Sequence, residues 1–368
     1  MKITEITVEY YRAPLPAAIS NARYTYATSE RCIVKVTTDE GITGVGVGDG
    51  GTGLAGAPQM IAGTVESLRP VLIGQDALAV ERLWQRMWNP KLIGRRGFTT
   101  RVISAVDIAL WDLRAKAFGV PVGILLGACH ERIPAYVAGG YYAPGKGLRD
   151  LASEMAGYVE RGARAVKMKV GGAALAEDVK RVAAVRAAVG TGTRLLVDAN
   201  NGYSVYEAVQ AARRLEELDV YWLEEPVMPD NYRGLREVGR ATSIPMASGE
   251  NEYTRYGFRD LLEHGQPGIL NPDVQFVGGV TEFMKIAALA QAHDIPVAPH
   301  GYHDLHVQLA TAIPNGLLVE YNPPEWDPLV AALQVNGLVL ADGYVSPPGG
   351  PGFGLVMDEV ALAAYRVL

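Results

Sequence analysis

The chain has 368 residues, of which 49% are hydrophobic and 20% are charged, and its formal net charge is −6 at pH 7. This length exceeds one ordinary domain and suits a barrel of roughly 200–250 residues with a smaller partner domain. The acidic balance gives no sign of a nucleic-acid or membrane partner, so an anionic substrate would need local positive charge from a metal ion or from lysines.

The cysteines and the first residues point to a cellular compartment. Cys32 and Cys129 lie far apart and lack metal-ligand spacing, which disfavours a disulfide framework or a zinc site and fits a reducing environment. The first residues lack the apolar run of a signal peptide, and no stretch approaches the length of a membrane span. We therefore expect a cytoplasmic protein.

Residues 1–130 predict an α+β capping domain. Residues 3–10 and 32–37 alternate like strands, and residues 42–47 form a third strand candidate. A polar, aromatic segment at residues 21–26 lies between the first two strands. Apolar residues recur at helical spacing over residues 101–118, which predicts a long helix.

Residues 131–330 predict a (β/α) barrel of the modified TIM type, (β/α)7β. Short apolar runs that end in polar residues alternate there with stretches of helical periodicity. Doubly wound sheets share this alternation, but the number of strands and the residues at their ends favour the barrel. We expect residues 331–368 to return and pack on the capping domain. The eight predicted strands are residues 133–137, 165–170, 195–198, 220–224, 244–247, 268–273, 295–299 and 316–320.

Three acidic residues follow consecutive predicted strands. Asp198, Glu224 and Glu250 are each separated from the next by 26 residues, about one βα unit. The functional residues of such barrels gather at the carboxyl ends of the strands, where three carboxylates would repel one another unless a cation lay between them. Hard oxygen ligands with open coordination positions suit Mg²⁺. Asn200 is a further candidate there, for hydrogen bonding or water coordination.

Two lysines end the second predicted strand. Lys167 and Lys169 are two residues apart, so both side chains face the same side, which we expect to be the barrel interior near its mouth. Burial, mutual repulsion and a nearby divalent cation would lower their pKa values, as a lysine needs to act as a base near neutral pH. A solvated pair at a strand end is the alternative.

The last three strand ends carry a further acid–base set. Asp273 and His300 are 27 residues apart, again one unit, and a carboxylate bonded to one imidazole nitrogen raises the basicity of the other. We interpret them as a catalytic dyad lying across the barrel from the lysines. Glu320 would close the ring and could donate a hydrogen bond to substrate if it is protonated.

This ordered set of residues resembles the enolase superfamily and, within it, the mandelate racemase group, over nearly the whole chain. The resemblance implies Mg²⁺ ligands at Asp198, Glu224 and Glu250, and a Lys or His base is characteristic of such sites. It further assigns a base to Lys169, a contact with the substrate carboxylate to Lys167 and Glu320, and a dyad to His300 and Asp273. Aspartate at position 273 argues against the muconate-cycloisomerase branch, which has a lysine there. The group also suggests a homo-oligomer.

The predicted reaction begins with removal of the proton alpha to a carboxylate, through an enediolate intermediate. The flanking stretches at residues 198–203 and 224–229 look like those of the acid-sugar enzymes in the group, which favours dehydration of an aldonate or aldarate to a 2-keto-3-deoxy acid. Racemisation, epimerisation or cycloisomerisation of a 2-hydroxy acid or sugar lactone is the alternative. An aldolase with a Schiff base on Lys167 or Lys169, and a barrel kept only for binding, are more remote.

We expect the residues that determine substrate specificity to lie in the loops. The glycine-rich residues 44–53 do not open a helix in a βαβ unit, so a dinucleotide site is a poor reading, and a mobile capping loop is the better one. With residues 21–26, which include Tyr26, this loop is expected to set specificity. His303 is a candidate for contact with substrate, and residues 347–354 are expected to be a loop.

Overall fold

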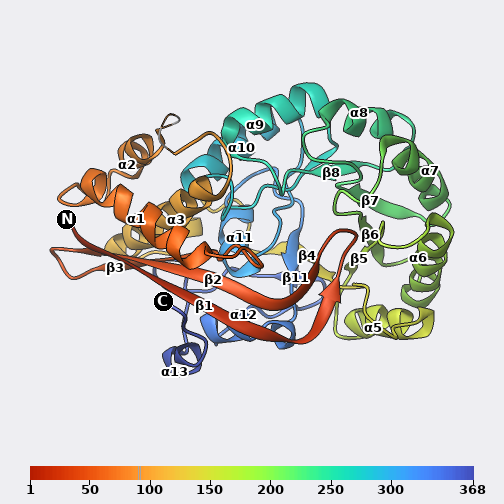
Figure 1. The fold of residues 1–368 in the computed structure, drawn as a ribbon, viewed down its shortest axis with the longest axis horizontal. Helices are drawn as coiled ribbons and strands as arrows, with labels where there is room; N and C mark the ends of the chain where they lie inside the picture. Colours follow the sequence, from red (N-terminus) through yellow and green to blue (C-terminus); the bar gives the residue numbers. More distant parts are fainter. Residues whose placement is uncertain (90, 92) are drawn as a thin grey trace.

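A three-stranded antiparallel sheet with helices packed on it lies beside a curled sheet of parallel strands (Figure 1). The computed structural model describes residues 1–89, 91 and 93–368. None of the described helices is both long and apolar enough to cross a membrane. The elements of the first region are β1 (Ile3–Ser20), β2 (Thr25–Thr38), β3 (Thr43–Asp49), α1 (Ala57–Leu72), α2 (Val80–Met87), α3 (Phe98–Phe118) and α4 (Val122–Leu125).

Strands β1 and β2 are much longer than predicted and form one extended hairpin. Pro14 lies within β1, and the pairing with β2 shifts register between Pro14 and Ile19. Proline is tolerated there because β1 is the edge strand of the order β1-β2-β3. The tip of the hairpin reaches the other region, where Ser20 and Tyr142 exchange backbone hydrogen bonds of 2.9 Å. The loop predicted at residues 21–26 is therefore this tip.

The prediction of a mobile loop at residues 44–53 is wrong for its first half, which is strand β3. Gly44, Gly46 and Gly48 alternate along β3 and face helix α3. A Cβ atom at Gly46 would lie 1.9 Å from the carbonyl oxygen of Ala105, so only glycine allows the helix to approach this closely. The loop is confined to the residues that follow Asp49.

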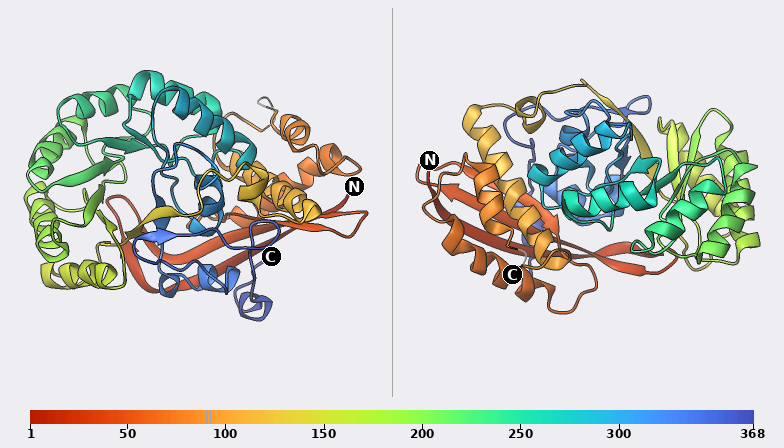
Figure 2. Two further views of the ribbon diagram at one scale, coloured as in Figure 1. Left: turned by 180° about the vertical axis from the view of Figure 1, so that it is seen from behind. Right: turned by 90° about the horizontal axis from the view of Figure 1, so that it is seen from above.

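The second region is a barrel whose strands follow the order β10-β4-β5-β6-β7-β8-β9. Helices follow these strands and form an arc on the outside (Figures 1 and 2). This confirms the predicted fold class. The strands are β4 (Ile133–Ala138), β5 (Ala165–Lys169), β6 (Arg194–Asp198), β7 (Val220–Glu224), β8 (Met246–Ser248), β9 (Ile269–Leu270) and β10 (Val319–Tyr321). The helices are α5 (Leu148–Glu160), α6 (Leu175–Val189), α7 (Val205–Glu216), α8 (Tyr232–Arg240), α9 (Thr254–Asp260), the π-helical turn η1 (Leu261–Gly265), α10 (Val280–Ala292) and α11 (His303–Ala310).

The seventh predicted strand, at residues 295–299, is reduced to isolated bridges. Val297 pairs with Leu270 on one side and with Gly316 on the other, both in parallel. Val319 of β10 then pairs with Ala135 of β4, so the ladder returns to its first strand. Because the strands twist into a ring, their carboxyl ends gather at one mouth.

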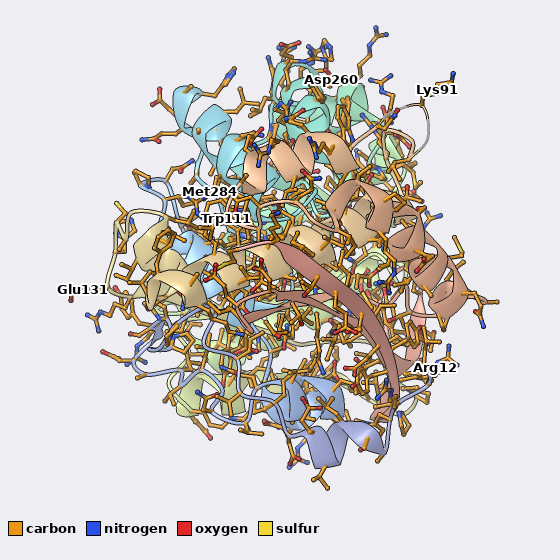
Figure 3. All side chains as sticks on the ribbon, turned by 90° about the vertical axis from the view of Figure 1, so that its left-hand side faces the viewer. Arg12, Lys91, Trp111, Glu131, Asp260 and Met284 are labelled. Carbon is orange, nitrogen blue, oxygen red and sulfur yellow. The ribbon has the colours of Figure 1, made fainter. Side chains whose placement is uncertain are left out.

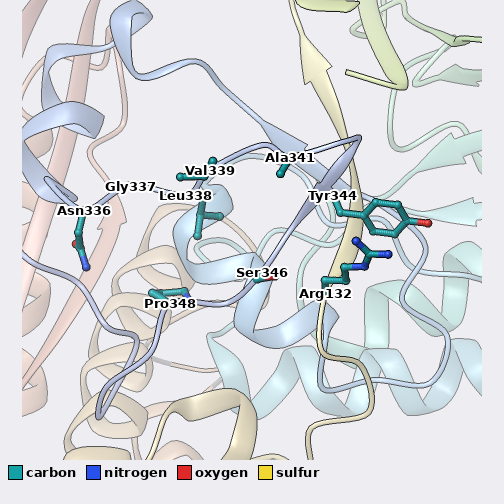
Figure 4. Close-up of a pocket in the computed structure, with 9 residues that line it drawn as sticks. All are labelled: Arg132, Asn336, Gly337, Leu338, Val339, Ala341, Tyr344, Ser346 and Pro348. Carbon is teal, nitrogen blue, oxygen red and sulfur yellow. The ribbon is translucent and has the colours of Figure 1, made fainter. Parts of the chain in front are cut away.

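The C-terminal residues contact both regions. The elements here are the 3-10 helix η2 (Pro324–Trp326), α12 (Pro328–Leu333), β11 (Tyr344–Val345) and α13 (Glu359–Ala363). Strand β11 pairs antiparallel with β4, whereas Leu368 and Tyr365 accept backbone hydrogen bonds from Tyr10 and Arg12 of β1. A hollow of about 350 Å³ opens beside β11, where Arg132 lies over the ring of Tyr344 (Figure 4).

Helix α3 joins the two regions along a seam that we define by Ser104, Asp107, Trp111 and Asp112. The Asp107 carboxylate accepts hydrogen bonds from the backbone N–H (2.9 Å) and the hydroxyl (2.7 Å) of Thr281, at the start of α10. The indole of Trp111 also donates to the Thr281 hydroxyl, at 2.9 Å. Figure 3 views this side of the molecule and labels Trp111 together with Met284 of α10.

Candidate active site

Three carboxylates meet at the barrel mouth. Asp198 ends β6, Glu224 ends β7, and Glu250 lies two residues beyond the end of β8. Asp198 pairs with Glu224 in the parallel ladder, so the register brings the two side chains together. Each of the three residues offers an oxygen, and these oxygens lie within 4.8 Å of one another. We call these three residues the carboxylate triad.

The triad has the chemistry that a hard divalent cation requires. Glu250 Oε2 and Asn200 Oδ1 are buried and have no hydrogen-bond partner among the described residues. Burial raises the pKa of Glu224 to about 8 and that of Glu250 to about 7, because neither charge is fully compensated. A divalent cation among oxygen ligands would provide that compensation, so the residues fit Mg²⁺.

Lys167 lies below the triad, in the barrel interior. Its Nζ donates to both oxygens of Glu224 at 2.9 and 3.0 Å, lies 3.5 Å from Glu320, and is 5.0 Å from the centre of the Tyr136 ring. Although burial lowers its pKa, Glu224 and then Glu320 outweigh that effect and hold the pKa of Lys167 well above its ordinary value. Lys167 is therefore an ammonium that neutralises carboxylates.

Lys169 lies at the end of β5, beside Asp198. Its Nζ donates to Asp198 Oδ2 at 2.5 Å. Burial lowers the pKa of Lys169, but Asp198 outweighs burial and the net direction is upward. The carboxylates that the next strands bring thus favour the ammonium form of both lysines, and the lowering of their pKa values beside a divalent cation stays a prediction. The same pairing holds the pKa of Asp198 below its ordinary value despite burial.

His300 and Asp273 form a hydrogen-bonded pair on the other side of the triad. His300 Nδ1 lies 3.1 Å from Asp273 Oδ2, and its Nε2 lies 3.5 Å from Glu250 Oε2. Burial lowers the pKa of His300, but Glu250 and Asp273 outweigh it and raise the pKa to about 10. The ring thus presents Nε2 toward the triad while Asp273 holds Nδ1.

Glu320 closes the ring of charged residues from β10. Its Oε2 accepts hydrogen bonds from the backbone N–H of Gly301 (2.8 Å) and from the hydroxyl of Tyr136 (3.2 Å). Burial raises its pKa, yet Lys167 and His300 outweigh burial and lower the pKa of Glu320 to about 2. The surrounding cations therefore favour the ionised form of Glu320, whereas the hydrogen bond to substrate was predicted only for its protonated form.

Glu225 connects the loops that carry the triad. Its carboxylate accepts hydrogen bonds from the side-chain amides of Asn201 and Asn251 and from the hydroxyl of Ser248. The backbone of Glu225 has a φ of 42°, in the left-handed region that residues other than glycine rarely occupy. These bonds compensate for the strain and fix the spacing of the triad. Asn200, with φ of 39°, donates its backbone N–H to Asp198 Oδ1 at 2.8 Å.

The hairpin tip covers the mouth. Arg23 donates to the carbonyl oxygen of Asn201 at 3.3 Å, and a Cβ atom at Gly202 would lie 2.6 Å from that of Ala22. Tyr26 is largely enclosed: burial raises its pKa to about 12, and Lys169 and Glu250 are among the groups whose charges act on it. Tyr26 therefore lies near the triad, as expected of a substrate-contacting residue.

His303 does not turn toward the triad. It is buried at the start of α11, where its Nδ1 accepts from the backbone N–H of Asn322 at 3.4 Å and its Nε2 faces Asp304 at 3.6 Å. Its ring packs on Tyr321, with centroids 5.1 Å apart. Nδ1 is thus engaged within the protein, and the packing on Tyr321 gives the ring a structural role.

Sequence reasoning missed three aromatic residues of the site. Tyr141 follows β4 and lies with its ring centre 5.1 Å from Lys169 Nζ. Trp222 donates its indole N–H to Glu224 Oε2 at 3.1 Å and packs edge-on against Tyr136 inside the barrel. An aromatic residue in a strand usually indicates core packing, and only the alternation that points Trp222 to the same side as Glu224 could have signalled its role.

Comparison with known proteins agrees with this geometry. Residues 150–361 match the family described as Enolase C-terminal domain-like, and residues 3–127 match the Mandelate racemase / muconate lactonizing enzyme, N-terminal domain. The chain is 35% identical to a 3,6-anhydro-alpha-L-galactonate cycloisomerase of Streptomyces coelicolor, over 99% of each chain. It is 32% identical to an arabinonate dehydratase of Saccharolobus solfataricus, over 90% of this chain and 89% of that one.

A solved structure extends the likeness to three dimensions. A racemase from Streptomyces coelicolor A3(2), whose structure contains bound magnesium, superposes with a TM-score of 0.92. That protein is 35% identical, and the match covers 99% of this chain and 100% of the other. The chain therefore belongs to the mandelate racemase / muconate lactonizing enzyme family of the enolase superfamily.

Proposed function

We propose that this protein is a Mg²⁺-dependent enzyme that removes the proton alpha to the carboxylate of an acid sugar and expels the oxygen on the β-carbon. The product is a 2-keto-3-deoxy acid. One observation carries this proposal: two proton-transfer groups approach the triad from different sides. Lys169 Nζ lies 2.5 Å from Asp198, whereas His300 Nε2 lies 3.5 Å from Glu250. A substrate held at the triad would meet both.

The proposed steps use the charges described above. Asp198, Glu224 and Glu250 would hold Mg²⁺, which would supply positive charge for the negative charge that develops on the substrate. Lys167, held between Glu224 and Glu320, adds a fixed ammonium beside the substrate carboxylate. Of Lys169 and His300, one removes the alpha proton as the base and the other protonates the departing oxygen as the acid.

The departing oxygen distinguishes dehydration from cycloisomerisation. A free β-hydroxyl leaves as water, whereas a β-oxygen that belongs to an anhydro ring stays attached, and the product is an isomer of the substrate. In both cases the C–H and C–O bonds break and the enol tautomerises to the 2-keto acid. The second outcome deserves equal testing because the cycloisomerase relative aligns over 99% of both chains.

The test is a panel of acid sugars with Mg²⁺, containing acyclic aldonates, aldarates and 3,6-anhydro acids. Formation of a 2-keto acid is followed with semicarbazide, and mass spectrometry separates loss of water from an unchanged mass. We expect keto acid from at least one substrate, and no turnover after metal removal with EDTA. An epimer without keto acid would contradict β-elimination. No conversion, together with no exchange of the alpha proton in D₂O, would contradict the whole proposal.

We also propose that the protein is a cytoplasmic homo-oligomer. The homo-oligomer is proposed from the resemblance to the mandelate racemase group. Size-exclusion chromatography with light scattering tests this, and a monomer at micromolar concentration would contradict it. Fractionation of the source cells tests the compartment.

A further inference from the structure

His306 lies on α11, behind the His300–Asp273 pair, and takes no part in the proposed proton transfers. Its side chain is fully buried. Its Nε2 accepts a hydrogen bond from the backbone N–H of Val274 at 3.0 Å and lies 3.8 Å from Asp273 Oδ1. Its ring packs near Phe283 of α10, with centroids 6.1 Å apart. The ring thus connects two helices to the loop that follows β9.

The hydrogen bond determines the protonation of this ring. Because Nε2 accepts from Val274, the ring proton must reside on Nδ1, which has no hydrogen-bond partner among the described residues. Burial lowers the pKa of His306 to about 4, so the ring stays neutral at neutral pH. A neutral ring does not compete with His300 for the negative charge of Asp273.

The loop that carries Asp273 is fixed at each successive residue. Asp273 Oδ1 accepts from the backbone N–H of Gln275 at 2.8 Å, while Oδ2 binds His300. The side chain of Gln275 donates to the carbonyl oxygen of Val47 in β3 at 3.0 Å. Val274 lies between these anchors, and His306 is the acceptor for its buried N–H. Loss of this acceptor would leave the buried N–H of Val274 unpaired unless the loop moved, and movement would displace Asp273.

We infer that His306 is a positioning residue, whose Nε2 holds the loop so that Asp273 can orient His300 toward the substrate. The inference rests on the proposed function, since it assigns His306 to the proton transfer through His300. It differs from a purely structural role because the atom that matters is a single acceptor nitrogen. A side chain that fills the same space without an acceptor should therefore fail.

The experiment compares His306→Leu with His306→Gln, whose side-chain oxygen can accept from Val274. We expect His306→Leu to lower kcat by about 10–100-fold with KM within about two-fold, as for other residues that orient a functional imidazole. His306→Gln should recover most of the loss. The matched control is Val307→Ala, its buried neighbour on α11, which should lower Tm while keeping kcat. Equal kcat in His306→Leu and wild type, or equal losses in the Leu and Gln variants, would overturn the inference.

A readout that does not need turnover separates this inference from the proposed function. The chain has six histidines, so ¹⁵N-histidine labelling with single substitutions can assign the His300 Nδ1 proton bonded to Asp273. We expect its signal to be lost in His306→Leu and kept in His306→Gln. If wild type converts no acid sugar but the signals behave this way, only the proposed function fails. If the signal survives in His306→Leu, the inference fails whatever the substrate.

Discussion

The barrel mouth and the α3 seam both bury carboxylates, but they satisfy them in opposite ways. In the seam, Asp112 accepts from the backbone N–H groups of Val45 and Phe353, both at 2.8 Å, and lies 2.6 Å from Lys116. At the mouth, the three carboxylates of the triad lie close to one another, and Glu250 Oε2 has no hydrogen-bond partner among the described residues. The seam is complete within the protein, whereas the mouth needs a cation and a substrate.

This difference separates stability from function. Buried carboxylates that are saturated by backbone donors hold segments together, and their loss exposes unpaired N–H groups. At the mouth, burial raises the pKa values of Glu224 and Glu250, which costs stability and indicates a binding role. Substitutions at the mouth should therefore change activity or metal affinity, and substitutions in the seam should change unfolding.

The largest expected effect is on turnover at the mouth. Lys169→Ala and His300→Asn should each lower kcat by about 10²–10⁴-fold, because each removes one of the two proton-transfer groups. Mg²⁺ should still bind, since the triad is intact, and calorimetry checks this. Retention of full activity in both variants would remove the acid–base assignment.

The next effect is on the metal. Glu250→Gln removes a ligand charge and should weaken Mg²⁺ binding by at least about 100-fold, beyond what loss of an outer-shell partner costs. Glu252→Gln is the matched control, because Glu252 is a buried carboxylate two residues away whose hydrogen bonds go to Tyr232 and the backbone of Tyr253. Titration calorimetry should show near-normal affinity in the control. Similar losses in both variants would contradict the assigned triad.

A substitution in the seam should reduce stability and leave activity unchanged. Asp112→Ala leaves the N–H groups of Val45 and Phe353 without their acceptor and should reduce the free energy of unfolding by roughly 2–4 kcal/mol. Because Asp112 is remote from the triad, kcat of the folded variant should be unchanged. Urea unfolding and steady-state kinetics measure the two quantities. If Asp112→Ala had normal stability but a low kcat, the proposed difference between the seam and the mouth would be contradicted.

A further effect, on the pH dependence of stability, arises in the seam. Burial raises the pKa of Asp107 from an ordinary 3.8 to about 7. The folded protein therefore keeps a proton that the unfolded chain releases, so this contribution to stability is complete below about pH 4 and is lost as pH rises through 7. Each pKa unit corresponds to about 1.4 kcal/mol. Urea unfolding between pH 5 and 8 should show Asp107→Asn gaining on wild type as pH rises, and parallel curves would contradict the assignment.

The residues at the strand ends could be predicted because their spacing repeats with the βα unit. Asp198 and Glu224 end apolar runs, and Glu250 continues the same interval, so that three acidic residues follow one another at 26-residue spacing. The length of β1 could not be predicted, because Pro14 is tolerated only where the strand is an edge. The strand predicted at residues 42–47 overlaps β3, but its glycines were also interpreted as part of a loop, because the helix that requires them, α3, is distant in sequence.

The charge states also depend on contacts that sequence spacing does not reveal. Asp198 stabilises the ionised form of Lys169, and Lys167 stabilises that of Glu320, and in each pair the partner comes from a different strand. Trp222 and Tyr141 were not identified, because an aromatic residue on a strand or after it reads as core until its polar neighbour is known. The pattern of strands and helices in the sequence thus predicts where these side chains lie. Their protonation states depend on the neighbouring charges that the folded protein brings together.

The α3 seam limits how a molecule can reach the mouth. Ser104 and Trp84 bind the backbone of Gly278 at 2.9 and 2.7 Å, in addition to the bonds of Asp107, so the N-terminal region cannot rotate as a whole without breaking buried bonds. The hairpin tip, by contrast, contacts the barrel at its surface, through Ser20 and the exposed Arg23. Entry and exit therefore depend on local opening of a few residues, a motion of nanoseconds to microseconds, which is fast compared with the turnover of most enzymes.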